Sequence, residues 1–353
     1  DLHMAKILMK GNEAVGEAMI QAGMKTYFAY PITPQSEVPE YLSRELPRRG
    51  GVFLQAESEV AAINMMYGSA GTGVRVATSS SSPGISLMQE GISYLAGAEL
   101  PCLIVNMMRG GPGLGSIQPS QTDYFQSTRG GGNGDYRLIC LAPASIQELV
   151  DLIHLGFNLS DLYRNPALIV ADGLLGQMME PVEFKPHEAY ELPAKDWAAS
   201  GTGGKRKPNI INSLYLSPDE LEEHNKHLIE KYRTITENEV RVEEVELEGA
   251  ELVMVAYGTT SRICKSAIEI LKEKGYKVGI IRPITLWPYP YEALAKHTDK
   301  ANMFFTVEMS AGQMIEDVKL AVNGKKPVEF YGRMGGVVPT PGEIFAKLME
   351  LVK

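Results

Sequence analysis

Residues 26–42 read TYFAYPITPQSEVPEYL, which is an apolar run, a turn that contains two prolines, and then a helical segment. The same unit recurs along the first half of the chain, with further apolar runs at 51–55, 74–79, 102–108, 137–142 and 167–172. Strands that alternate with helices are typical of a parallel, doubly wound sheet. We therefore predict that residues 4–180 form an α/β domain of this class.

The alternation stops after residue 180 and resumes near residue 250. Residues 181–249 are polar and charged, which is typical of a connector, and Ser217-Pro218 within it signals the start of a helix near 218–237. From 250 to 353 the α/β pattern returns, with apolar runs at 252–258, 278–283 and 303–308 and helical patterns near 260–274 and from about Pro341. We predict a second, smaller α/β domain there.

The composition argues against several classes of protein. The formal net charge is −9 and no long basic stripe occurs, so we expect no nucleic-acid partner. No apolar run reaches the roughly 20 residues that cross a bilayer, and the N-terminal residues lack an apolar leader, so we expect a cytoplasmic protein without a membrane partner. The chain has only three cysteines, Cys102, Cys140 and Cys264, which are far apart and form no C-x-x-C pair. It therefore cannot supply the ligands of a four-cysteine iron–sulfur cluster.

Loops that follow predicted strands carry the candidate site residues. The carboxyl ends of parallel strands meet at one edge of a sheet, where open α/β sheets bind their ligands. Thr33 is placed to cap a helix that has Pro34 in its first turn, which would direct free N–H groups at a carboxylate. The alternative is that Thr33-Pro34 only begins a helix.

Three further loops should face the same edge. Glu59 opens a helix after the run at 51–55; it is either an ordinary first-turn carboxylate or a partly buried one tuned for chemistry. Residues 78–85, TSSSSPGI, offer hydroxyl groups. Arg109 begins RGGPGLGS, in which a guanidinium fork suits a carboxylate or phosphate and glycines let backbone approach a ligand. A mobile surface loop is the alternative for this last segment.

The combination of these motifs resembles a known family. YPITPQSE, the Ser58-Glu59-Val60-Ala61-Ala62 segment, the TSSSSPG loop and the RGGPGLG loop together resemble the α subunit of the 2-oxoacid:ferredoxin oxidoreductases. The resemblance also covers 256–259 and 278–283, and residues 109–137 look most like the branched-chain type that acts on 2-oxoisovalerate. It implies a thiamine-diphosphate-binding domain of the pyrimidine type followed by a domain like the transketolase C-terminal domain.

The resemblance also implies roles for single residues. Glu59 would bind N1′ of the cofactor's pyrimidine ring and so take part in catalysis, and Thr33 and Arg109 would hold the carboxylate of the 2-oxoacid. The implied reaction is oxidative decarboxylation of the 2-oxoacid with coenzyme A to an acyl-CoA, CO2 and reduced ferredoxin. The other cofactor contacts that the resemblance implies are Pro31, Ile32, Ser82 and Pro83.

One motif of the family is missing from this chain. The family holds the diphosphate and Mg2+ with a Gly-Asp-Gly motif, and the nearest match, Ala171-Asp172-Gly173, follows a different strand and lacks the first glycine. We therefore expect no metal site on this chain. Mg2+ and the iron–sulfur clusters would lie on partners, namely a thiamine-binding β subunit, a γ subunit and a ferredoxin-like δ subunit, and the chain would be active only in that hetero-oligomer.

Three alternatives stay open at this point. The same chemistry on 2-oxoglutarate, pyruvate or an aryl pyruvate is the first, because one or two contacts can change the preference of a pocket. The second is a transketolase-like subunit or one from a lipoamide-dependent dehydrogenase complex. The third is a non-catalytic scaffold, against which the presence of Thr33, Glu59 and Arg109 argues.

Overall fold

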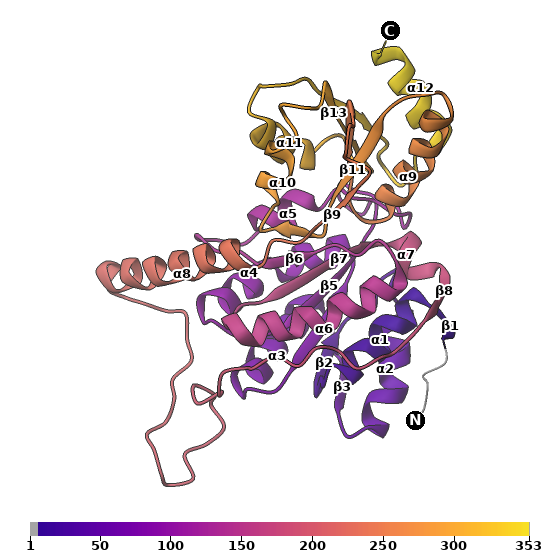
Figure 1. The fold of residues 1–353 in the computed structure, drawn as a ribbon. Coiled ribbons are helices and arrows are strands. Elements are labelled where there is room, and N and C mark those ends of the chain that lie inside the picture. Colours follow the sequence, from indigo (N-terminus) through magenta and orange to yellow (C-terminus); the bar gives the residue numbers. More distant parts are fainter. Residues whose placement is uncertain (1–5, 353) are drawn as a thin grey trace.

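The computed structural model describes residues 6–352 and contains two large sheets, one above the other in Figure 1. The first sheet has seven strands in the order β12-β6-β7-β5-β4-β2-β3. All neighbouring pairs are parallel except β12 with β6. Its strands are β2 (Thr26–Ala29), β3 (Val52–Gln55), β4 (Val76–Ser80), β5 (Leu103–Met108), β6 (Ile139–Leu141), β7 (Ala167–Asp172) and β12 (Thr285–Trp287).

Helices cover both faces of this sheet. The chain moves outward from β2 to β3 and then back to β4, and right-handed crossovers in opposite directions place the intervening helices on opposite faces. One layer holds α1 packed on α2 and α6, and the other holds α3 packed on α4. The helices are α1 (Gly11–Gln21), α2 (Glu37–Arg48), α3 (Glu59–Gly71), α4 (Ser82–Gly97), α5 (Tyr124–Arg129), α6 (Ile146–Tyr163) and α7 (Gly173–Gln177). The predicted doubly wound sheet is confirmed.

The second sheet has five strands in the order β14-β13-β10-β11-β9. Its strands are β9 (Val242–Val245), β10 (Leu252–Val255), β11 (Val278–Pro283), β13 (Met303–Glu308) and β14 (Val328–Gly332), and its helices are α9 (Gly258–Glu273), α10 (Tyr291–Ala295), α11 (Met314–Val322) and α12 (Pro341–Leu351). Met254, Ile280 and Phe305 lie in a core cluster of their own beneath α9 and α12. These strands and helices form the smaller α/β unit that was predicted for the second half of the chain.

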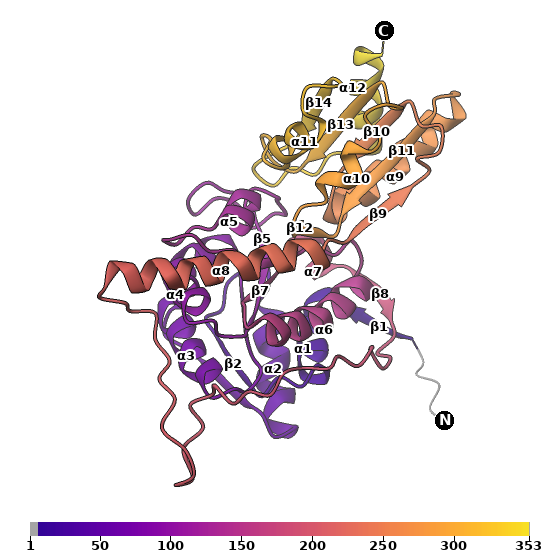
Figure 2. The same ribbon diagram turned by 60° about the vertical axis from the view of Figure 1, so that its left-hand side comes forward.

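Residues between the two sheets depart from a plain connector. Residues 183–217 contain no helix or strand. The chain first packs against the first domain, where Lys195 pairs with Asp161 at 2.7 Å and Ala198 is buried, then loops outward before α8 (Pro218–Asn238) (Figure 2). β9, which lies within the predicted connector, pairs antiparallel with β11. β12, from the second half of the chain, pairs antiparallel with β6 of the first sheet. The domain limits at 180 and 250 stay predictions, because strands of each half contribute across them.

The remaining strands form a small sheet near the N-terminus. β1 (Ile7–Lys10) pairs antiparallel with β8 (Met179–Val182). Within residues 6–352, no helix combines the length and the apolar character that crossing a bilayer requires.

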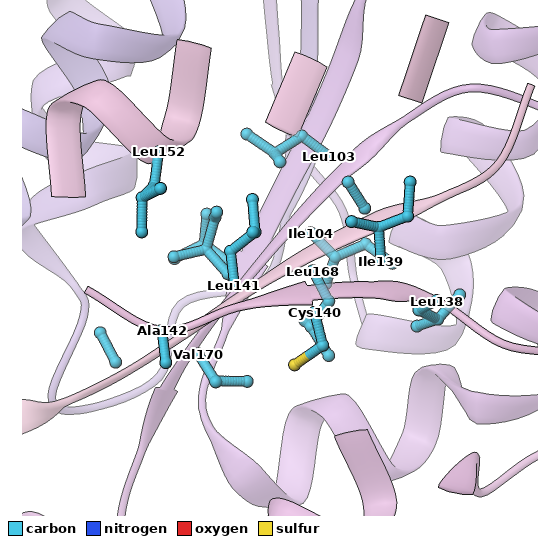
Figure 3. Close-up of a cluster of buried hydrophobic side chains, with 14 of the residues drawn as sticks. Leu103, Ile104, Leu138, Ile139, Cys140, Leu141, Ala142, Leu152, Leu168 and Val170 are labelled. Carbon is cyan, nitrogen blue, oxygen red and sulfur yellow. The ribbon is translucent and has the colours of Figure 1, made fainter. Parts of the chain in front are cut away.

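The core of the first sheet consists of side chains from its central strands (Figure 3). β5 and β7 are buried at every position, which is typical of strands that are covered on both faces. Cys140 lies near Leu168 and Val170 in the same cluster, while Leu103 points to the other face of the sheet. All three cysteines are buried and unpaired, and burial raises the pKa of each thiol. Their burial identifies them as packing residues.

A buried arginine links the second sheet to a helix that covers the first sheet. Arg282 at the end of β11 is 6% exposed and donates two hydrogen bonds, of 2.8 and 2.9 Å, to the Glu148 carboxylate in the first turn of α6. Its Nε donates to Glu243 in β9 at 2.5 Å. These bonds raise the pKa of the Arg282 guanidinium against the effect of its burial, so the group stays charged.

Removal of this guanidinium should destabilise the contact between the two sheets. Arg282→Met leaves the Glu148 and Glu243 carboxylates without their shared cation, and we expect the free energy of unfolding to fall by about 3 kcal/mol. Urea unfolding followed by circular dichroism measures the change. Arg233→Met is the matched control, because Arg233 pairs with Glu230 on the exposed face of α8. Equal shifts of the unfolding midpoint in both variants would contradict the assignment.

Candidate active site

The predicted site residues lie at the carboxyl edge of the first sheet, as their positions after strands require. Thr33 follows β2, Glu59 is the first residue of α3 after β3, Ser82 is the first residue of α4 after β4, and Arg109 follows β5. The strands β5, β4, β2 and β3 are consecutive neighbours in the sheet. One edge therefore presents a hydroxyl, a carboxylate and a guanidinium group within a single row of loops.

Arg109 is held between two loops at this edge. It is 6% exposed, and its Nη1 donates to the Thr33 carbonyl oxygen at 3.0 Å while Nη2 donates to the Leu114 carbonyl oxygen at 2.9 Å. Its Nε is buried and has no partner among the residues that the structure describes. The structure thus brings Arg109 and the Thr33 loop together, and it leaves the guanidinium without a carboxylate beside it.

Ser82 is fixed by a small buried network. Its hydroxyl donates to Asp123 Oδ2 at 2.5 Å and accepts from the Arg109 backbone N–H at 3.0 Å. Asn106 donates to the same Asp123 oxygen at 2.9 Å and accepts from the Ser82 backbone N–H at 3.1 Å. Burial raises the pKa of Asp123, and the bonds from Ser82 and Asn106 oppose that rise. The network ties the N-terminus of α4 to β5 and to its loop.

The sequence interpretation missed Asn106 and Asp123. A signal for Asn106 was present, because it is the polar residue within the apolar run CLIVNMM. A polar side chain in a strand buried at every position needs a hydrogen-bonding partner. Nothing local marked Asp123, because its role depends on contacts with residues 17 and 41 positions away.

Glu59 is buried at the start of α3. Ser58 caps the helix by accepting from the Ala61 N–H at 3.1 Å, and the Glu59 side chain is 7% exposed. A Cβ added to Gly84 would lie 2.8 Å from Glu59 Oε1 and 2.0 Å from Ser80 Oγ. Gly84 therefore lets the backbone of α4 lie against Ser80 and the Glu59 carboxylate, a close approach that any larger residue would prevent.

Several buried polar groups at this edge of the sheet lack partners. The hydroxyls of Thr78, Ser80 and Ser81 and the Gln35 Nε2 are buried without a hydrogen bond among residues 6–352. Gln35 Oε1 accepts from Ser79 at 2.5 Å, so its amide is held in place. Buried polar groups without hydrogen-bonding partners indicate a binding site for a ligand with complementary heteroatoms. A ring with nitrogen donors and acceptors, such as an aminopyrimidine, fits that requirement.

Thr33 does not cap a helix, so that expectation is wrong. The helix α2 begins at Glu37, with Ser36 in the capping position. The Pro34 carbonyl oxygen instead accepts from Asn12 Nδ2 at 2.7 Å and Gln177 Nε2 at 3.1 Å, so it is not free to start the helix. On the turn that precedes α2, Pro31 and Thr33 are exposed and Ile32 is half-buried.

Ala171-Asp172-Gly173 has a structural role. Asp172 caps α7 by accepting from the Leu174 and Leu175 N–H groups, and its other oxygen accepts from the Thr259 hydroxyl in the second sheet's α9. Burial raises the pKa of Asp172. Among the described residues, no cluster of three histidine, cysteine, aspartate or glutamate side chains could hold a metal ion.

Comparisons with known proteins agree with this geometry. Residues 17–248 match the family model for the thiamine-diphosphate-binding part of pyruvate flavodoxin/ferredoxin oxidoreductases, and residues 250–344 match core domain II of pyruvate:ferredoxin oxidoreductase. The ketoisovalerate oxidoreductase subunit VorB of Methanothermobacter marburgensis is 51% identical over 348 residues, which is 99% of this chain and 98% of the relative. The 2-oxoglutarate synthase subunit KorA of Archaeoglobus fulgidus is 35% identical over 98% of both chains.

Two solved structures resemble the fold. The 2-oxoglutarate:ferredoxin oxidoreductase of Magnetococcus marinus matches with a TM-score of 0.86 and 27% identity over 99% of this chain and 66% of that one. A split-gene transketolase matches with a TM-score of 0.60 and 14% identity over 97% of both chains, which shows the fold alone. On the family match and the 51% relative, this chain belongs to the thiamine-diphosphate-dependent 2-oxoacid:ferredoxin oxidoreductases, as one of their subunits.

Proposed function

We propose that this chain holds the pyrimidine end of thiamine diphosphate in an enzyme that converts 2-oxoisovalerate and coenzyme A into an acyl-CoA, CO2 and reduced ferredoxin. The observation that carries the proposal is the buried Glu59 carboxylate, which Gly84 allows to pack closely beside the unpartnered Ser80 hydroxyl. The relative named as a ketoisovalerate oxidoreductase subunit supports the choice of substrate.

Each site residue then has a task. When bound, thiamine diphosphate supplies the carbon nucleophile that attacks the 2-oxo group. Glu59 would hold a proton at the pyrimidine N1′, and Pro31, Ile32, Ser82 and Pro83 would contact the cofactor. Arg109 and Thr33 would bind the substrate carboxylate. The buried guanidinium, bonded here only to carbonyl oxygens, suits an anion because a charged acceptor makes the stronger hydrogen bond.

The rest of the active site would come from partner subunits. Among the described residues, no group of three histidine, cysteine, aspartate or glutamate side chains could hold a metal ion, and the three cysteines are buried. Two adjacent helices that begin at the site, α3 and α4, also expose apolar side chains: Val60 at 46%, Leu87 at 54% and Tyr94 at 40%. An apolar helix surface next to an incomplete site supports a partner that covers it. We propose a thiamine-binding β subunit there, with γ and ferredoxin-like δ subunits, and with Mg2+ and iron–sulfur clusters on these partners.

Other substrates and reactions remain as rivals to be tested. Relatives named as 2-oxoglutarate synthase subunits are 32–35% identical, so the same chemistry on 2-oxoglutarate is the main alternative. The transketolase likeness concerns the fold alone and offers no argument for that reaction.

A substrate panel tests the function directly. The chain co-expressed with its partner subunits should reduce methyl viologen when given 2-oxoisovalerate and coenzyme A, with a higher kcat/KM than for 2-oxoglutarate or pyruvate. Omission of coenzyme A should abolish the steady-state rate. Higher kcat/KM for 2-oxoglutarate would reject the substrate, and no reduction with any 2-oxoacid would reject the proposed function.

Glu59→Gln should remove the acid–base function and keep the shape of the side chain. Turnover should fall by at least about a hundredfold, the lower range for loss of a general acid–base group. Exchange of the cofactor's C2 proton, followed by nuclear magnetic resonance, should slow in parallel, while assembly stays intact. Glu57→Gln is the control, because Glu57 is exposed two residues away. Unchanged C2 exchange in the Glu59 variant would exclude Glu59 from this step.

Gly84→Ala should interfere with cofactor binding. The added Cβ would overlap Ser80 Oγ and crowd the Glu59 carboxylate, so we expect the Kd for thiamine diphosphate in the assembled enzyme to rise by about tenfold, equivalent to about 1.4 kcal/mol. Calorimetric titration of the cofactor-free complex measures it. Gly68→Ala in α3 is the matched control, because no atom lies within 4 Å of the Cβ it would add. Equal affinity in both variants would show that cofactor binding does not depend on a glycine at position 84.

A further inference from the structure

A cavity of about 630 Å3 opens beside Thr33, between the first sheet's carboxyl edge and a loop of the second half of the chain. Thr33 is one of its lining residues, and the Arg109 guanidinium donates to the Thr33 carbonyl oxygen. The cavity is therefore next to the position at which the substrate carboxylate is proposed to bind. Its apolar walls include Pro34, Ile117, Leu174 and Val338.

Close backbone contacts between loops build this cavity. A Cβ on Gly173 would lie 2.8 Å from the Pro34 ring, and a Cβ on Gly110 would lie 2.8 Å from the Gly335 carbonyl carbon. A Cβ on Gly336 would lie 2.5 Å from the Gln118 side chain. Because glycine permits each approach, three separate loops meet tightly around the cavity, and its walls are set by packing.

The walls are apolar and open. Ile117 is 55% exposed and Leu174 is 37% exposed, and both face the cavity together with the half-buried Val338. Apolar side chains that line a concave site lose contact with water when an apolar group enters, at a gain of about 25 cal/mol per Å2 of apolar surface buried. The chemistry of these walls therefore fits a hydrocarbon group.

Two carboxylates stand among the lining residues. Glu37 accepts from Lys10 at 3.1 Å, from Asn12 at 2.9 Å and from Gln177 at 3.1 Å, and these bonds keep its pKa below the usual value despite partial burial. Glu40 is exposed one helical turn further along α2. Lys10 lies 3.1 Å from Glu37 and offsets its charge, so Glu40 supplies the negative charge beside the apolar part of the wall, and a second carboxylate on a substrate would be repelled.

We propose that this cavity receives the alkyl side chain of the 2-oxoacid, that Ile117, Leu174 and Val338 select a branched aliphatic group, and that Glu40 excludes acidic side chains. The inference rests on the proposed function and adds to it the residues on this chain that determine specificity. It accounts for discrimination between 2-oxoisovalerate and 2-oxoglutarate, which differ in having an isopropyl group or a distal carboxylate.

Filling the cavity tests the inference in the assembled enzyme. Leu174→Trp should lower the ratio of kcat/KM for 2-oxoisovalerate to kcat/KM for pyruvate by about tenfold, mainly through KM, because the methyl group of pyruvate needs less room. Ile117→Trp, in a surface loop, should act in the same direction and serves if the first variant folds poorly. Leu320→Trp is the matched control, because Leu320 is 64% exposed on α11, away from the lining residues.

Reversing the charge tests the second half of the inference. Glu40→Lys should raise the kcat/KM for 2-oxoglutarate relative to 2-oxoisovalerate by about tenfold, and Glu45→Lys, further along α2 and outside the cavity, should not. Calorimetric binding of each 2-oxoacid without coenzyme A gives a readout independent of turnover. Substrate ratios unchanged by all three cavity variants would overturn the inference while leaving the proposed function standing. A wild-type enzyme that turns over no 2-oxoacid would instead reject the proposed function.

Discussion

The buried side-chain amide of Gln121 joins the two halves of the molecule, and the geometry of the site depends on it. Its Nε2 donates to the Tyr257 carbonyl oxygen at 2.9 Å, and its Oε1 accepts from the Thr260 hydroxyl at 2.8 Å and the Met309 N–H at 3.0 Å. An amide that makes three hydrogen bonds in a low-dielectric interior favours one arrangement, because a shift would leave polar groups unpaired. The loop after β5, which begins with Arg109 and contains Asp123, is thereby fixed against the second sheet.

In the second half of the chain, a buried carboxylate shapes the turn that contacts this loop. Glu308 at the end of β13 is fully buried and accepts from the backbone N–H groups of Gln313, Met314 and Ile315, which shapes the turn that follows. Gln313 then accepts from the Phe125 N–H at 2.9 Å. Burial raises the pKa of Glu308, and these backbone bonds oppose the rise. The second sheet thus orients residues of the active site without supplying any of the predicted catalytic groups.

Local patterns were enough for the central strands of both sheets and for the edge at which they end, whereas β1, β8, β9, β12 and β14 were not predicted. The apolar runs at 102–108 and 167–172 became β5 and β7, and Glu59 and Arg109 lie where a parallel sheet places residues that follow its strands. Contacts between distant residues were not accessible in this way. β12 pairs with β6 across more than 140 positions, the Thr33 turn is decided by Asn12 and Gln177, and Gln121 has no local signal at all. Each depends on a partner that periodicity cannot identify.

Two charges at this edge explain why the chain needs other molecules to complete its site. The Arg109 side chain is buried and bonds only to carbonyl oxygens, and Glu59 is buried at the start of α3; within residues 6–352 neither forms an ion pair. A buried charge without a counter-charge is costly unless a ligand compensates it. An anionic substrate would compensate the arginine, and a protonated ring nitrogen would compensate the glutamate. The two groups without a counter-charge are thus the ones that would bind substrate and cofactor most strongly.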